Sequence, residues 1–418
     1  MHDTDTYELR QPTADPETLR AFLQSVAIAF GDDYTGEMFE LDRQLLEMDR
    51  LIGAVEGDTW VGGATAESRR LTVPGGAEVR AAAISGVGVL PTHRRRGILT
   101  SLMRWLLEQA AERGEPVSVL HASEGAIYPH FGYGMGTLQG SIDAERSAFR
   151  FSRPAEPLGQ VRFVDIDEGM RTIPALYDQA RAGRSGEVSR SPSVWRLQLL
   201  SDNTWRRAAM GPKSNAVLFV GGEPRGYALY RTKADWGDRG PKNTLNILDV
   251  TGLDPAAERA LWEWLAGIDL VGQIKAWRTP VHNPLLLEVV EPQRLGLTVR
   301  DGLWLRLVDV QAALEARTYV GPGRLTLEVT DAFLPSNAGR WTLDVPGDRG
   351  AGSVAPAADG VPADIELDIA DLATIYLGAF TFAGLVRAGR ARECRDGAAA
   401  VADTLFATAA APWCSTMF

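Results

Sequence analysis

Apolar and polar positions in the first third of the chain follow two different periods. An apolar, β-branched run at 79–89 predicts a buried strand, and Pro91 ends it because proline has no N–H to give to a strand ladder. Beyond Gly97, apolar residues recur at helical spacing and predict a helix over about 96–113. A further apolar run at 116–121 predicts a second buried strand. The pattern therefore indicates a strand, a tight turn, a helix and a strand.

The rest of residues 1–150 is also mixed. Asp15, Pro16 and Glu17 predict a helix start, because proline suits the first turn and acids suit the positive end of the helix dipole. Four short runs, separated by Gly-rich and Pro-Gly turns, are strand candidates. These runs are 7–10, 50–56, 59–66 and 70–73.

Residues 151–305 repeat this layout. Runs at 217–220 and 227–230 predict a hairpin across a Gly-rich turn. A strand is expected at 245–250 and a helix at 255–265, in the same order as around residue 94.

Residues 306–418 have a third pattern, with alternating strands at 324–329, 340–345 and 364–369 and a largely apolar helical stretch within 372–387. At 418 residues the chain exceeds one ordinary hydrophobic core. We therefore expect a mixed α/β (α+β) protein with domains at 1–150, 151–305 and 306–418.

Composition narrows the class of protein. Apolar residues make up 45% and charged residues 23%, which is typical of a soluble globular protein. The net charge of −11 argues against a nucleic-acid partner and favours cationic small molecules or peptides. No run approaches the roughly 20 apolar residues that span a bilayer, and the N-terminus lacks the apolar core of a signal peptide. These features predict a cytoplasmic protein.

The two cysteines, Cys394 and Cys414, form no C-x-x-C pair. A zinc site or a disulfide framework is therefore not expected, and a reducing compartment is the default. The histidines also lack the spacing of metal ligands, so no metal is expected.

The junction between the strand and the helix carries chemistry. Arg94, Arg95, Arg96 and Gly97 precede the first helical turn, with Thr92 as a candidate cap. The first N–H groups of a helix lack internal partners, and the dipole is positive there. Basic side chains and a glycine that allows close backbone approach make this a seat for a phosphate or pyrophosphate.

These residues resemble a known family. Arg94-x-x-Gly97-x-Leu99 resembles the R/Q-x-x-G-x-G/A pyrophosphate motif of GNAT N-acetyltransferases, with Leu99 in place of a small residue. Residues 91–97 and 120–134 together resemble the Eis (enhanced intracellular survival) family within this group. The likeness recurs at 301–306 and 312–317 and so spans most of the chain.

The resemblance implies two fused GNAT-like domains, only the first active, followed by a sterol-carrier-like domain. It implies acetyl-CoA as co-substrate, no metal, and a homo-oligomer, typically a hexamer. Two parallel strands would splay apart, so that backbone groups of Val87, Gly88 and Val89 pair with the pantetheine amides like an added strand. The side chains of Val87 and Val89 can pack in the core at the same time. Backbone N–H groups from Arg95 to Leu99, through Ile98, would hold the pyrophosphate.

The second strand-to-helix junction, at 251–255, differs from the first. It has no arginine cluster, and Asp254 adds an acid at the helix start. Because this carboxylate competes for the charge that a phosphate needs, the second domain is not expected to bind CoA.

Acetyl transfer from a thioester needs an acid that gives a proton to the leaving thiolate. A tyrosine suits this role, because its pKa of about 10 is near that of an alkyl thiol. The residues alone leave Tyr128 and Tyr133 open; the resemblance implies Tyr128. Ser123 is expected either to contact the cofactor arm or to cap a short helix.

The C-terminus is apolar up to its last residue, Phe418, although chain ends are usually polar and frayed. The last residue is therefore expected to be docked, or else the tail is merely buried or disordered. The resemblance implies that the Phe418 carboxylate is the general base.

The acceptor pocket is expected to be anionic and aromatic. Asp32 resembles an aspartate in the pocket of the family, and Asp33 and Tyr34 are neighbouring candidates; a solvated cluster is the alternative for the acids. Gly86 stands where members of the family carry a bulky ring, which implies a more open pocket.

The expected function is acetyl transfer from acetyl-CoA to amines of cationic acceptors, by resemblance aminoglycosides, acetylated at one or several positions, or lysine side chains. The alternatives are a lipid or sterol carrier, from the last domain, and a catalytically inactive acyl-CoA sensor.

Overall fold

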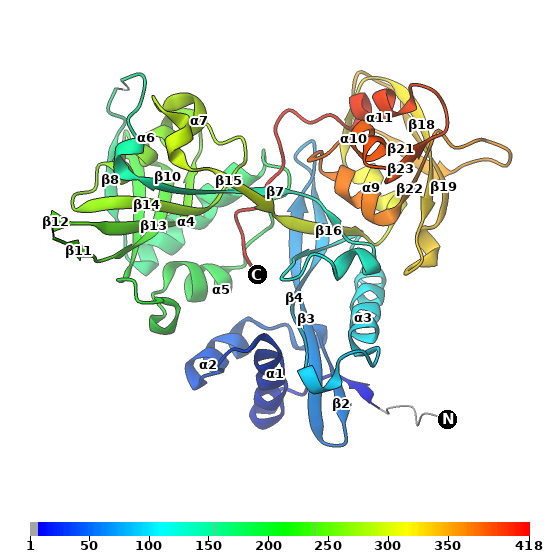
Figure 1. Ribbon diagram of the computed structural model, residues 1–418, viewed down its shortest axis with the longest axis horizontal. Helices are drawn as coiled ribbons and strands as arrows, with labels where there is room; N and C mark the ends of the chain where they lie inside the picture. Colours follow the sequence, from blue (N-terminus) through cyan, green and yellow to red (C-terminus); the bar gives the residue numbers. More distant parts are fainter. Residues whose placement is uncertain (1–6, 155, 239) are drawn as a thin grey trace. The chain divides into compact units, whose positions relative to one another are not determined.

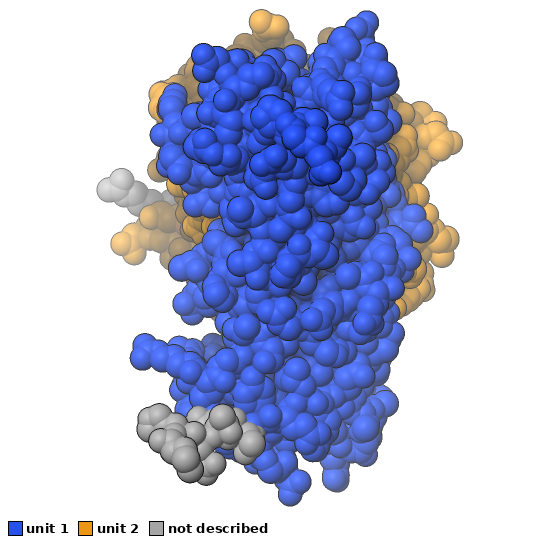
Figure 2. Space-filling view, turned by 90° about the vertical axis from the view of Figure 1, so that its right-hand side faces the viewer, with its two compact units in different colours: residues 1–136, 303–409, 417–418 blue, residues 137–302, 410–416 orange. Residues whose placement is uncertain are grey.

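The computed structural model describes residues 7–154, 156–238 and 240–418. The chain forms two compact units, shown in blue and orange in Figure 2. Residues 1–136, 303–409 and 417–418 form the first unit. Residues 137–302 and 410–416 form the second unit. Each unit therefore contains segments that are far apart in the sequence.

The first unit contains a seven-stranded sheet in the order β1-β2-β3-β4-β5-β16-β6, in which β4 and β5 are parallel and the other described neighbours are antiparallel. The two predicted strands at 59–66 and 70–73 are one long strand, β3, paired with β4 (Figure 1). The strands are β1 (Glu8–Arg10), β2 (Leu51–Glu56), β3 (Thr59–Thr72), β4 (Glu78–Val89), β5 (Val117–His121), β6 (Gly134–Met135) and β16 (Leu303–Leu307).

Three helices accompany this sheet: α1 (Pro16–Phe30), α2 (Gly36–Leu45) and α3 (Ile98–Glu112). The predicted start of α1 is confirmed, since Asp15 Oδ2 accepts from the Thr18 N–H at 2.9 Å and Pro16 opens the helix. The expected cap of α3 is wrong. Thr92 lies in a short 3-10 turn and hydrogen-bonds the ring of His93, and Gly97 precedes the first residue of the helix.

The second unit has its own seven-stranded sheet, in the order β15-β7-β14-β13-β10-β9-β8, with β13 and β14 parallel. The predicted hairpin is formed by β9 and β10. The strands are β7 (Leu138–Glu145), β8 (Gln160–Phe163), β9 (Lys213–Val220), β10 (Glu223–Lys233), β13 (Asn243–Gly252), β14 (Val271–Thr279) and β15 (Thr298–Asp301), with a small pair β11 (Trp236–Gly237) and β12 (Gly240–Pro241). The helices are α4 (Ile166–Arg181), α5 (Pro192–Val194), α6 (Pro255–Ala266) and α7 (Leu285–Glu288).

Residues from 310 onward in the first unit form an α+β region with a five-stranded sheet, β21-β19-β18-β22-β23 (Figure 1). The predicted helical stretch at 372–387 is two helices, α9 and α10, separated by residues 377–381, where Gly378 has a φ of +88°. The strands are β17 (Thr318–Val320), β18 (Gly323–Thr330), β19 (Gly339–Val345), β20 (Arg349–Ala351), β21 (Ser353–Pro356), β22 (Ile365–Asp368) and β23 (Ala391–Glu393). The helices are α8 (Val310–Ala316), α9 (Ile369–Tyr376), α10 (Phe382–Arg387) and α11 (Ala398–Phe406).

Within the described ranges, no helix has the length and apolar character needed to cross a membrane.

Candidate active site

The parallel ladder between β4 and β5 ends early. Ala81–Ile84 pair with Val117–Leu120, and β4 then continues to Val89 without a further partner residue in β5. At Gly86 the backbone has a φ of +57° and β4 shifts register against β3. A bulge of this kind bends a strand and re-aims its edge. Among the described residues, the β5-facing edge of β4 beyond Ile84 is thus open to pairing with an extended ligand.

The predicted backbone positions in β4 lie on this segment. Val87 and Val89 are half-buried and their side chains pack against the core of the first unit, so the expected core contact is present. Gly88 is buried, and a Cβ there would lie 2.9 Å from the Cβ of Ala29 in α1. The glycine therefore allows α1 to lie close to this strand.

The turn before α3 has an open helix start. Gly97 has a φ of +81°, and the first turn of α3 has no side-chain cap. Among the residues that the structure describes, a Cβ at Gly97 would meet only the Tyr7 hydroxyl, at 3.8 Å. Ile98 is buried beneath the turn and Leu99 is half-buried, so the leucine that departs from the motif packs against the core. The N–H groups at this helix end are available to an anion.

The three arginines of the turn are not equivalent. Arg94 and Arg95 are exposed, and Arg95 has a φ of +63°. Arg96 Nη2 instead lies 2.7 Å from Glu56 Oε1 at the end of β2, and His93 Nε2 lies 2.8 Å from the other carboxylate oxygen. Arg96 and His93 together lower the pKa of Glu56 to about 2. Arg96 thus fixes the turn to the sheet, while Arg94 and Arg95 face solvent.

Replacing Gly97 with valine is expected to weaken binding of CoA, the ligand that the family resemblance implies, at least tenfold. A β-branched residue is strained at positive φ, and its side chain would cover the open helix start. Isothermal titration with CoA measures the change. Gly114→Val is the matched control, because Gly114 also has a positive φ, of +65°, with open space around it, and follows the other end of α3. Equal CoA affinities in the two variants would remove Gly97 from the binding site.

The two candidate tyrosines have different surroundings. Tyr133 is fully buried, and its hydroxyl lies 2.7 Å from Ser118 Oγ, which donates to the Ala82 carbonyl. Tyr128 is 7% exposed, and within the described residues its hydroxyl makes no hydrogen bond; burial and the nearby Glu124 raise its pKa. The ring centroids are 6.0 Å apart. Tyr133 is thus part of a structural network, and Tyr128 retains a proton that it can donate.

Ser123 is exposed in the loop between β5 and the 3-10 turn Tyr128–Phe131. The capping alternative is wrong, because Ile127 occupies the N-cap position of that turn and no side chain caps it.

The chain end lies beside β5 in the first unit. The ring of Phe418 is 5.1 Å from that of His121, the last residue of β5, and 5.9 Å from the guanidinium carbon of Arg69 on β3. The tail is thus docked, as expected, at the end of the strand where the ladder with β4 has opened. Sequence reasoning gave no role to Arg69, which lies in an ordinary strand, or to His121, which belongs to the run at 120–134 but was not singled out within it.

Helix α1 packs on β4, and the loop that follows α1 holds the candidate residues of the acceptor pocket. A Cβ at Gly86 would contact the side chains of Thr65 and Val26, and a Cβ at Gly88 would lie 3.6 Å from the ring of Phe30. Asp32 and Asp33 follow and are exposed, whereas Tyr34 donates its hydroxyl to Asp42 Oδ2 at 2.9 Å. Burial and Asp42 raise the pKa of Tyr34. The two aspartates face solvent, and the tyrosine hydroxyl is held within the loop region.

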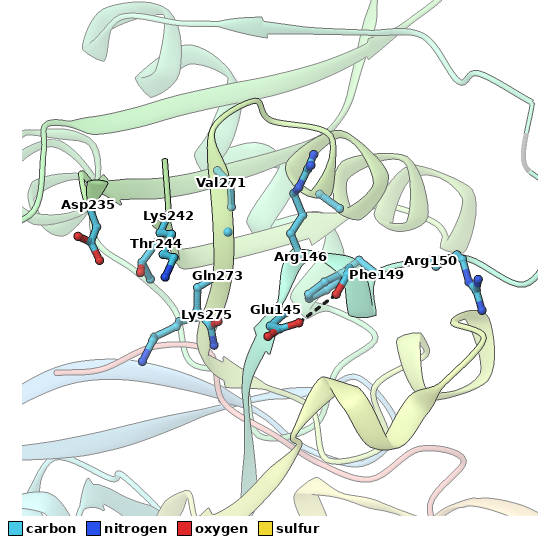
Figure 3. A pocket seen from close by; sticks show the side chains of 13 residues that line it. Glu145, Arg146, Phe149, Arg150, Asp235, Lys242, Thr244, Val271, Gln273 and Lys275 are labelled. Carbon is cyan, nitrogen blue, oxygen red and sulfur yellow. Dashed lines mark hydrogen bonds between the residues drawn. The ribbon is translucent and has the colours of Figure 1, made fainter. Parts of the chain in front are cut away.

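The second unit has a polar cavity of about 790 Å³, shown in Figure 3. Its basic residues are accompanied by acids; Lys275, for example, contacts Asp143 at 2.8 Å. Its wall includes Ala266, the last residue of α6. Because a helix C-terminus repels anions, this cavity is not a counterpart of the seat before α3.

The comparisons with known proteins agree with this architecture. Residues 11–136 and 186–307 each match a family model described as an acetyltransferase (GNAT) domain, and residues 310–415 match a sterol carrier protein domain. An uncharacterized N-acetyltransferase of Streptomyces avermitilis is 43% identical over 375 residues, which is 90% of each chain.

Two further relatives carry the Eis name. N-acetyltransferase Eis of Mycobacterium tuberculosis is 35% identical over 349 residues, 81% of each chain. The crystal structure of Eis1 from Mycobacterium abscessus superposes with a TM-score of 0.83, at 33% identity, covering 99% of this chain and 100% of that one. The chain therefore belongs to the Eis family of GNAT N-acetyltransferases.

Proposed function

We propose that this N-acetyltransferase moves the acetyl group of acetyl-CoA to amines of cationic acceptors, aminoglycosides or lysine side chains. The observation that carries the proposal is a convergence in the first unit. The open edge of β4 leads to the uncapped start of α3, and β5, the strand beside it, ends at His121 against the terminal Phe418.

The residues present fit acetyl-CoA. The β4 edge at Val87–Val89 supports pairing with the pantetheine arm, and the N–H groups from Arg95 to Leu99 support binding of the diphosphate, with Arg94 and Arg95 free to neutralise it. When bound, acetyl-CoA supplies the activated acetyl thioester.

Tyr128 is proposed as the general acid. Burial raises its pKa, so its hydroxyl remains protonated at neutral pH and can donate to the leaving thiolate. Tyr133 is a poorer candidate because its hydroxyl already hydrogen-bonds Ser118.

The Phe418 carboxylate is proposed as the general base. An ammonium group must lose a proton before its nitrogen can attack a thioester, and a carboxylate at the end of a docked tail can accept it. The contact of the Phe418 ring with His121 supports this role, because it places the last residue at the end of β5.

Asp32 and Asp33 are proposed to attract the cationic acceptor. Both are exposed, and they follow the helix that packs against β4. The net charge of −11 favours the approach of polycations as well.

The proposal is tested by incubating the protein with acetyl-CoA, a thiol reagent and a panel of aminoglycosides and lysine peptides. Thiol release that depends on an added amine is expected, with at least one polyamine acting at micromolar to millimolar concentration. CoA binding without release in any of the panel would instead support an acyl-CoA sensor.

An apolar cavity favours one alternative, a carrier of apolar ligands. A cavity of about 590 Å³ lies in the first unit between the region around Tyr133 and helices α9 and α10. Its wall includes Tyr133, Trp304, Phe380, Leu385, Ala388 and Arg390. Binding of a fluorescent fatty acid, with no amine-dependent thiol release, would favour the carrier over the transferase.

A further inference from the structure

A buried polar cluster in the second unit takes no part in the catalysis described so far. Its members are Tyr177 on α4, Glu187 and Arg190 in the segment after α4, Tyr227 on β10 and Asp249 on β13, each at most 9% exposed. Arg190 Nη1 donates to Asp249 Oδ2 at 2.6 Å, and the Tyr227 hydroxyl donates to the same oxygen at 2.9 Å. Burying charges is costly, and apolar residues would often stabilise a fold equally well. The cluster is thus better suited to recognition than to folding alone.

The segment that the cluster recognises is the C-terminal tail. Arg190 donates from Nε to Thr416 Oγ1 and from Nη2 to Ser415 Oγ, both at 2.8 Å. Glu187 Oε2 accepts from the Ser415 N–H at 3.0 Å and from its hydroxyl at 2.9 Å. The Tyr177 hydroxyl lies 3.0 Å from Thr416 Oγ1. Two of the three guanidinium nitrogens of Arg190 therefore bind tail side chains, through charge-assisted hydrogen bonds.

The cluster lies where this domain would otherwise hold a cofactor. The parallel ladder of β13 and β14 ends at Ile247 and Ala276, and Asp249 comes just beyond it. The start of α6 is also taken, because Asp254 Oδ1 accepts from the Ala257 N–H at 2.8 Å and Asp254 pairs with Arg225. In both domains, the first strand of the parallel pair continues beyond the end of the ladder. In the second domain, the polar groups at this point bind the chain's own tail.

These contacts are made close to the last residue of the chain, and they therefore limit where that residue can lie. Ser415 and Thr416 are followed by only Met417 and Phe418. Two residues span at most about 7 Å when fully extended, so holding Thr416 restricts the terminal carboxylate to a small volume.

We propose that the second, degenerate GNAT domain is a clamp for the C-terminal tail, with Glu187 and Arg190 as positioning residues that hold Ser415 and Thr416 and so limit the movement of the Phe418 carboxylate. The proposal rests on the assignment of that carboxylate as the general base. It gives the second domain a part in the reaction without a cofactor of its own.

The test changes the tail, so that the buried cluster keeps its own members. The variant Ser415→Ala/Thr416→Val lacks both hydroxyls that the clamp binds. Ser415→Ala with Thr416→Ser restores one of them, and Thr404→Val, in an exposed position on α11, is the matched control. Carboxypeptidase A is applied to the native full-length proteins, and release of Phe418 is followed by mass spectrometry. Turnover with the best amine of the panel, and the Kd of CoA, are measured in parallel.

In the double variant, Phe418 release is expected to be at least tenfold faster and kcat at least tenfold lower, with the Kd of CoA within twofold of the original. The restored hydroxyl should recover part of both effects, and Thr404→Val should change neither. Unchanged cleavage and turnover in the double variant would overturn the clamp.

A chain lacking Phe418 separates this inference from the assignment of the base. If that chain is inactive while the double variant behaves like the original protein, the clamp is wrong and the base stands. If the shortened chain keeps full turnover, the base assignment is wrong, and the clamp is then judged by cleavage alone: faster release supports it, and unchanged release overturns it.

Discussion

A short polar tag added after Phe418 is expected to lower turnover by roughly 10²-fold to 10⁴-fold, the usual worth of a positioned proton acceptor. The tag converts the terminal carboxylate into a neutral amide, which cannot take the proton of the attacking ammonium. The diphosphate seat before α3 does not involve the tail, so the Kd of CoA is expected to stay within twofold. Steady-state kinetics and isothermal titration measure the two quantities.

The matched control carries the same tag before Met1 and is expected to keep full turnover. Deletion of Phe418 should reproduce the loss, because it removes both the ring that contacts His121 and the carboxylate in its native place. Full activity of the C-terminally tagged chain would rule out the carboxylate as base.

Replacing Tyr128 with phenylalanine is expected to lower kcat by roughly 10²-fold to 10⁴-fold, with little change in the Kd of CoA. The change removes the hydroxyl oxygen, which makes no hydrogen bond within the described residues, so the fold should be unaffected. Because burial raises the pKa of Tyr128, it should remain protonated through neutral pH, and the original enzyme should lose activity through this group only above about pH 10. A pH–rate profile measures this loss of activity at high pH.

Tyr133→Phe is the control for this change. It breaks the hydrogen bond to Ser118 and is expected to lower the free energy of unfolding by about 0.5–1.5 kcal/mol, with turnover reduced far less than in Tyr128→Phe. If Tyr133→Phe were inactive and Tyr128→Phe retained its turnover, the roles of the two tyrosines would be exchanged.

The local pattern predicted the elements that place the site, because their signals lie within a few residues. Asp15 and Pro16 start α1 as expected, and the apolar run at 79–89 is β4. Thr92 does not cap α3 because Pro91 starts a separate 3-10 turn that includes Thr92. The chain then enters the helix through Gly97, whose φ is positive. Short-range chemistry thus predicted the helix, but not how it begins.

Contacts between distant parts of the chain could not be predicted. The strand β16, at 303–307, lies between β5 and β6 in the first sheet, whereas β7, at 138–145, belongs to the second. Both runs are ordinary strands in sequence, and nothing local states which sheet each one joins. The same holds for Arg190, which binds residues 225 and 226 positions further along the chain.

A crystal structure of the protein with CoA tests the central claim most directly. The account predicts the diphosphate on the N–H groups before α3, the pantetheine arm along β4 beyond Ile84, and the sulfur within hydrogen-bonding distance of the Tyr128 hydroxyl, with the Phe418 carboxylate on the same side. A diphosphate bound elsewhere, or a sulfur far from both groups, would contradict it.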